Sequence, residues 1–173
     1  NQCRGQADVS GPLTRDGDIR ARVIGVYQQN DTYIDFYSQK KHLLYGVVEA
    51  DITPTTTVSG GASFQRDAPR GSPAGGVGWP LFFSNGEQNS PARSTNFNSR
   101  DNRVWNEALN IFSRIEQKIG EDWTLNGTFN YLENRQAGSV VGAATWLGVA
   151  NAETGLGIPL YAERFEGHQK QYA

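Results

Sequence analysis

The chain has 173 residues, of which 37% are hydrophobic and 11% aromatic, and its formal net charge is −2. This slightly negative net charge does not indicate a nucleic-acid-binding protein, which would carry an excess of basic residues. The two histidines have no cysteine or acidic residue at ligand spacing, so no metal site is predicted. No stretch approaches the ~18 apolar residues of a transmembrane helix, which excludes a helical membrane protein only, because strands that cross a membrane alternate with polar residues.

Alternation of apolar and polar residues predicts four strands in the first half of the chain. The predicted strands cover residues 5–13, residues 19–29 and, on either side of a short turn at Pro54, residues 42–65. The sequence TRDGD at residues 14–18 predicts a turn between the first two strands, since Asp-Gly is a common turn signal. A polar loop is expected at residues 30–41.

The second half of the chain predicts two further strands and long connections. Residues 66–103 lack periodicity and are rich in Gly, Pro, Ser and Asn, which predicts a loop longer than compact soluble domains usually carry. Strands are predicted at residues 104–119 and 123–133, around a tight turn. A second long segment covers residues 135–167, and the last residues begin another strand. The sequence therefore predicts an all-β fold: an antiparallel up-and-down meander of about six or seven long strands.

The lengths of these strands and connections indicate an outer-membrane β-barrel. Runs of about ten alternating residues exceed the five or six residues typical of strands in soluble proteins, and they match strands that cross a bilayer. The tight turns fall at one end of the predicted sheet and the longer loops at the other, as in barrels with short periplasmic turns and long extracellular loops. Two alternatives stay open: a passive porin-like channel, and a soluble all-β ligand-binding module.

Each face of the predicted sheet fits this interpretation. Aromatic residues lie toward both ends of the apolar face, with Trp123 near a turn and Tyr27, Phe64, Tyr131 and Trp105 toward the loops, as in the girdles of barrels. The opposite face is predicted to carry a charge ladder of Asp8, Arg20, Arg22, Glu49 and Asp51. If the second and third strands pair around residues 35–36, Arg20 faces Asp51 and Arg22 faces Glu49, while Asp8 faces Arg22 across the first turn. Such cross-strand pairs contribute about 0.2–1 kcal/mol each and indicate a wet surface.

The sequence predicts no catalytic chemistry. Glu49 and Asp51 lie on one strand face, as a glycosidase pair would, but arginines are available to both and we favour structural ion pairs. The G-x-S-x-G motif of a nucleophile elbow is absent. We therefore expect a chain that is not an enzyme and binds no cofactor.

Four strings, in this order and spacing, resemble the front part of the barrel of TonB-dependent siderophore receptors of the ferripyoverdine or ferrioxamine type. They are DVSGPLTRDG, LLYGVVEADITPTTT, GGASFQRDAPRG and GWPLFFSNG. The resemblance extends over residues 7–172. It implies a 22-stranded outer-membrane barrel around an N-terminal plug that contacts TonB. Since the chain also lacks methionine, we expect residues 1–173 to be a partial barrel, without the plug or the later strands.

The resemblance further implies a role in the uptake of a ferric siderophore, with TonB and outer-membrane lipid as the other partners. In such receptors aromatic and polar loop residues capture the ligand above the plug. The candidates in this chain are Tyr33, Tyr37, Trp79, Phe82, Phe83 and Trp105. Apolar residues on the otherwise polar inner face are expected to contact the plug: Ile24, Val26, Val47 and Phe112.

Overall fold

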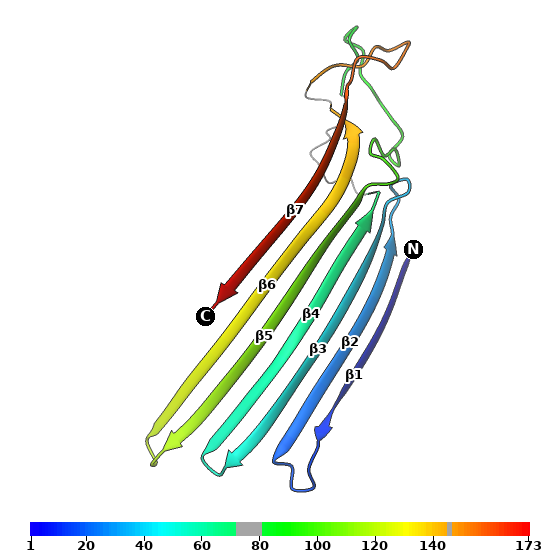
Figure 1. Cartoon of the computed structure of the whole chain (residues 1–173). Coiled ribbons are helices and arrows are strands. Elements are labelled where there is room, and N and C mark those ends of the chain that lie inside the picture. Colours follow the sequence, from blue (N-terminus) through cyan, green and yellow to red (C-terminus); the bar gives the residue numbers. More distant parts are fainter. Residues whose placement is uncertain (72–80, 145–146) are drawn as a thin grey trace.

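The computed structural model describes residues 1–71, 81–144 and 147–173. Seven strands in this part of the chain pair antiparallel in chain order and form one sheet (Figure 1). The strands are β1 (Gln2–Pro12), β2 (Ile19–Asp31), β3 (Ser38–Thr53), β4 (Thr56–Arg70), β5 (Arg103–Ile119), β6 (Trp123–Ala143) and β7 (Leu160–Tyr172). The prediction of an antiparallel all-β meander is confirmed.

The strands extend further toward the loop end than the sequence pattern predicts. β6 continues to Ala143, ten residues beyond its predicted end at residue 133, and β7 begins at Leu160 instead of in the last residues. With 21 residues, β6 is about 70 Å long at ~3.3 Å per residue. The backbone ladder continues through residues 134–143, where apolar and polar residues no longer alternate, so the sequence signal of a strand ends before the strand does.

Short turns and long connections segregate to opposite ends of the sheet (Figure 1). The turns between β1 and β2 and between β5 and β6 each contain a glycine with positive φ, Gly17 at 80° and Gly120 at 66°. That backbone conformation is costly for other residues, so glycine determines where the chain reverses. The connections at the other end are residues 32–37, 71–102 and 144–159.

One face of the sheet, which we term the outward face, presents its apolar side chains to the surroundings. Exposed fractions are 53% for Val23, 59% for Leu44, 62% for Leu125 and 75% for Trp123. In the described part of the chain the buried hydrophobic residues are Val104, Val140, Ala144 and Ala150, and none of them covers this face. A broad uncovered apolar face is rare on soluble monomers, and it matches the lipid-facing surface of a barrel.

No helix in the described residues is long and apolar enough to cross a membrane.

The opposite, inner face is mainly polar, but it also carries the predicted apolar residues Ile24, Val26 and Val47 and one aromatic patch. The rings of Tyr45 and Phe112 stack with centroids 6.1 Å apart. Phe112 also lies over Gly61, because a Cβ atom at that glycine would come within 2.7 Å of the Phe112 Cζ. The Phe112 ring thus occupies the space that a side chain at position 61 would need, and part of the inner apolar surface packs against the sheet itself.

Candidate functional site

The predicted charge ladder forms two ion-pair groups on the inner face. The guanidinium of Arg20 donates to Glu49 Oε1 at 2.7 Å and to Asp51 Oδ2 at 2.6 Å. Arg22 makes a two-pronged contact with Asp8, at 2.9 and 2.6 Å. The Arg20 and Arg22 side chains stay 43% and 52% exposed, so water screens these pairs and their net contribution to stability is small. Because these ion pairs are exposed and balanced, the inner face near the short turns is wet and its net charge is close to zero.

The register predicted for this ladder is wrong by two residues. Arg20 lies directly opposite Glu49, and Arg22 lies opposite Val47, so Arg22 does not face Glu49. The connection at residues 32–37 is centred one residue earlier than the predicted 35–36. Moving the centre by one residue moves every partner by two, which keeps each side chain on its predicted face. Arg20 still reaches Asp51, as a diagonal neighbour.

The predicted loop aromatics do not gather into one cluster among the described residues. Tyr33 is 63% exposed, and the Arg93 guanidinium carbon lies 5.0 Å from its ring centre. Tyr37 is half-buried at the end of the same connection. Phe82, 55% exposed, and Phe83 belong to a tight turn in which the Phe83 amide donates to the Glu87 carbonyl at 2.8 Å. Trp79 falls outside the described residues.

Trp105 is not a loop residue. It lies within β5, directly opposite Ala137, and shares the outward face with Arg66, whose guanidinium carbon is 6.0 Å from the indole centre. The predicted strand at residues 104–119 already includes this residue, and the register turns its side chain away from the interior. A ligand-binding role for Trp105 stays a prediction that this orientation does not support.

Asparagine side chains tie the long connections to the upper edge of the sheet. The amide of Asn96 donates to the carbonyls of Asp35 at 3.0 Å and Gly71 at 2.8 Å. Asn102 is 1% exposed, and its Oδ1 accepts from the Val141 amide at 2.7 Å. The Ser84 amide donates to the Ala150 carbonyl, which joins the second and third connections. These bonds hold residues of all three connections together at one end of the sheet.

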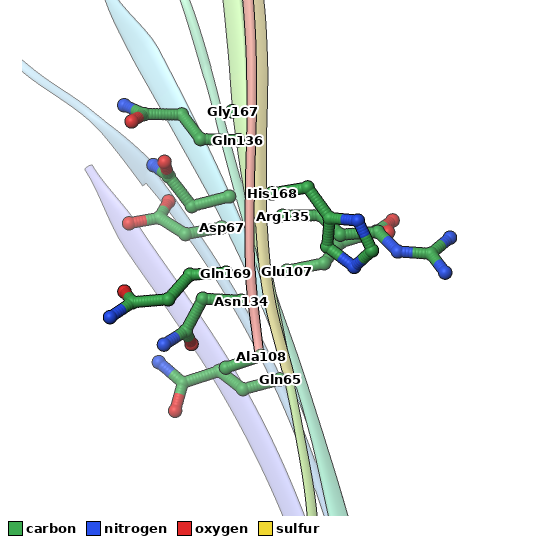
Figure 2. Close-up of a pocket in the computed structure, with 11 residues that line it drawn as sticks. Gln65, Asp67, Glu107, Ala108, Asn134, Arg135, Gln136, Gly167, His168 and Gln169 are labelled. Carbon is green, nitrogen blue, oxygen red and sulfur yellow. The ribbon is translucent and has the colours of Figure 1, made fainter. Parts of the chain in front are cut away.

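A group of amide side chains on the upper inner wall was not predicted as a site. Figure 2 shows Gln65, Asn134, Gln136 and Gln169 on the same side of the sheet as Asp67, with Glu107, Arg135 and His168 on the other. We term this group the amide wall: Gln39, Gln65, Asp67, Asn106, Asn134, Gln136 and Gln169. These residues, except Gln39, line part of a concavity of about 490 Å³. The sequence signal was available, since Asn and Gln occupy alternate positions in β6.

Amide and carboxylate groups of this wall retain hydrogen-bonding capacity. Gln39 Nε2 donates to Asp67 Oδ2 at 2.9 Å, and the Lys41 ammonium lies 3.9 Å from the same oxygen. The second oxygen, Asp67 Oδ1, and the nearby Asn110 Oδ1 are buried without a partner among the described residues. Buried polar atoms are usually satisfied, so this wall is suited to a polar ligand or to ordered water.

No protein-family model matches the chain. Individual relatives do: the chain is 37% identical over 130 residues to the ferric-pyoverdine 358 receptor of Pseudomonas putida, covering 75% of the chain and 15% of that receptor. It is 34% identical over 120 residues to the ferripyoverdine receptor of Pseudomonas aeruginosa, covering 69% of the chain and 15% of that receptor. The chain thus spans about 15% of the length of these relatives.

Solved structures extend the similarity to nearly the whole chain. The ferripyoverdine receptor of the Pseudomonas aeruginosa outer membrane, bound to ferripyoverdine, matches with a TM-score of 0.89 at 27% identity, over 99% of this chain and 22% of that one. The alcaligin outer-membrane receptor of Bordetella pertussis matches with a TM-score of 0.55 at 20% identity, over 99% of this chain and 27% of the receptor, which shows a shared fold. The homologues of this chain are thus outer-membrane ferripyoverdine receptors, and its sheet matches the barrel of TonB-dependent receptors.

Proposed function

From this homology, we propose that the chain forms a segment of the barrel wall of an outer-membrane receptor that takes up a ferric siderophore of the pyoverdine type. The observation that carries the proposal is the match of its seven strands and their connections, over 99% of the chain, to a receptor bound to ferripyoverdine. The exposed apolar face supports it independently, because that face needs lipid around it.

The two faces of the sheet suit two different surroundings. The outward face contacts lipid along its apolar band, while the inner face presents paired charges below and the amide wall above. Amide groups donate and accept hydrogen bonds without a net charge. Such a surface suits a polar, peptide-like iron chelate, which it holds by several weak bonds and can release again.

We assign initial capture of the siderophore to residues of the long connections. Tyr33, Tyr37, Phe82 and Phe83 remain candidates, together with Trp79. Exposed aromatic residues on tethered loops commonly serve binding, and Arg93 over the Tyr33 ring adds a cation that suits an anionic chelate. The outward side chain of Trp105 does not take part in this proposal.

Transport in this scheme involves binding and rearrangement without covalent chemistry. The homologues are receptors and not enzymes. Energy from the inner membrane would reach the receptor through TonB and a plug. A passive channel needs neither of them, so dependence of uptake on energy separates the two functions.

The first experiment deletes the gene that encodes this chain and measures uptake of ⁵⁵Fe-pyoverdine in iron-starved cells, with and without a protonophore. We expect uptake to disappear in the deletion strain and in protonophore-treated wild-type cells. Uptake that survives the protonophore would indicate a passive channel. A gene product found only in the soluble fraction of the cells would refute an outer-membrane receptor.

A pair of variants tests the assignment of the loops. In the complete gene product, Tyr33→Ala is expected to weaken binding of ferric pyoverdine about tenfold, as loss of an aromatic contact of 1–2 kcal/mol would. Trp105→Ala removes an aromatic side chain from the outward face and should leave the affinity unchanged. Equal effects of the two substitutions on the dissociation constant would refute the assignment.

A further inference from the structure

The outward face changes abruptly from apolar to charged at one level of the sheet. Below that level the outward positions of β1 to β6 carry one charged side chain among the described residues, Glu133. Direct register then joins His42, Arg66, Glu107, Arg135 and His168 into one row. In β3 and β4 this row lies two residues beyond Leu44 and Phe64. Aromatic rings lie close to the change: Tyr27 is 5.1 Å from His42, and Tyr131 is 5.1 Å from Tyr172. The change therefore has the position of the upper edge of the hydrocarbon layer.

Cations outnumber carboxylates on the outward face at this end of the sheet. We term the cations the cationic belt: Lys40, Arg66, Arg70, Arg103, Arg135, Arg164 and Lys170. The carboxylates on the same face are Asp31, Glu107, Glu133 and Glu166. Seven positive charges against four negative charges leave a net excess of three.

Only part of the belt is neutralised within the sheet. Arg66 lies 3.5 Å from Glu107, and Arg135 lies 2.6 Å from Glu133. Four side chains of the belt make no ion pair or side-chain hydrogen bond with any described residue. They are Lys40, Arg70, Arg103 and Arg164. Unpaired guanidinium groups close together repel one another and favour an anion among them.

The unpaired cations surround one shallow concavity of the outward face. Its volume is about 870 Å³, and its lining includes Lys40, Arg66, Arg70, Arg103 and Arg164. Trp105 and Ala137 also line it, so an apolar surface lies beneath the guanidinium groups. A phosphate that is attached to an amphiphile would satisfy both parts: charge-assisted hydrogen bonds from arginine, and apolar contact with the indole.

The opposite rim of the sheet has the reverse charge. Its turns contain Asp16, Asp18, Glu121 and Asp122, with Arg15 as the cation among them. Cations are therefore not a general feature of both membrane boundaries in this chain. They occur at the end with the long connections, which in outer-membrane barrels faces the cell exterior.

We infer that the cationic belt binds the phosphate groups of the glycolipid in the outer leaflet, with Lys40, Arg70, Arg103 and Arg164 as the principal contacts. The inference rests on the outer-membrane location within the proposed function. The siderophore is not the ligand of this surface, because the belt lies on the outside of the barrel wall. Bound lipid would fill the concavity and anchor the wall at the level of the headgroups.

The test uses the complete gene product in detergent and titrates it with lipid A, counting bound lipid by native mass spectrometry. The outward variant combines Lys40→Gln, Arg70→Gln and Arg103→Gln. The matched control removes the same charge from the inner face by Arg4→Gln, Lys41→Gln and Arg114→Gln. Both variants lose three positive charges, and Lys41 is the direct neighbour of Lys40 on the other face of β3, so this pair is also matched in strand position.

We expect the outward variant to bind lipid A at least about tenfold more weakly, the control to stay within about twofold, and dephosphorylated lipid A to bind neither protein well. Heat-modifiable electrophoretic mobility confirms that each variant is folded. Equal weakening in both variants, no weakening in the outward variant, or equal binding of dephosphorylated lipid A would overturn the inference. Siderophore affinity of the outward variant should be unchanged, so failure here is distinguishable from failure of the proposed function.

Discussion

Val23 offers a direct test of which face of the sheet meets lipid. It lies on the outward face in β2, midway between Ile19 and Tyr27, and its side chain is 53% exposed. The next residue, Ile24, points to the inner face and lies opposite Asp8. We predict that Val23→Arg strongly destabilises the membrane-inserted protein, whereas Ile24→Arg is tolerated.

The expected magnitude follows from the position of Val23 in the strand. Four residues at ~3.3 Å each separate it from either end of the apolar stretch, which is about 13 Å along the strand and about 10 Å along the membrane normal at a tilt of ~40°. Val23 is thus near the midplane of an apolar band about 25 Å tall. An arginine there costs about 2–4 kcal/mol. Ile24→Arg places its cation near a carboxylate in a wet interior and should cost within about 1 kcal/mol.

The assay is the free energy of unfolding of the complete gene product in lipid vesicles, from denaturant titration. The amount of assembled protein in the outer membrane of cells provides a second measurement. The Val23→Arg variant should show both a lower free energy of unfolding and less assembled protein. Equal costs for the two substitutions, or a greater cost for Ile24→Arg, would refute the assignment of the faces.

Three further substitutions test contacts within the sheet. Gly61→Ala should destabilise the protein by about 1–3 kcal/mol in the same titration, because its Cβ would overlap the backbone carbonyl oxygen of Gly46 and the Phe112 ring. Gly25→Ala meets open space and should be neutral within about 1 kcal/mol. Asn102→Ala leaves the Val141 amide without its partner and should lower the free energy of unfolding by about 1–3 kcal/mol. Proteolysis of residues 81–102 should become faster, and unchanged proteolysis would contradict the tethering role of Asn102. Arg20→Gln should lower the denaturation midpoint more than Arg22→Gln does, since Arg20 serves two carboxylates, and the reverse order would count against this assignment.

The alternation pattern was sufficient to predict the strands that lie within the apolar band. Every predicted strand is present, and Trp123 and Tyr27 lie on the predicted face. The alternation pattern did not predict the strand segments beyond the apolar band, at the end of the sheet with the long connections. There β6 continues for ten residues past its predicted end. Apolar and polar residues no longer alternate there, which removes the periodic signal, while the backbone hydrogen bonds that hold the strand do not depend on side-chain polarity.

The amide wall shows why the predicted site was incomplete. Its residue types were visible, but the side of the sheet on which each one lies depends on an unbroken register through regions without apolar alternation. The same holds for the cationic belt, whose members come from five strands. Neighbours across strands are distant in sequence, so only pairing reveals them.

Local sequence determined the meander, because alternation and turn residues act over a few neighbouring positions. Tertiary structure alone decided the exact partners in the charge ladder and the assembly of the belt. Those features depend on where each strand slides against the next, and a shift of one residue in the centre of a connection changes every cross-strand pair by two positions.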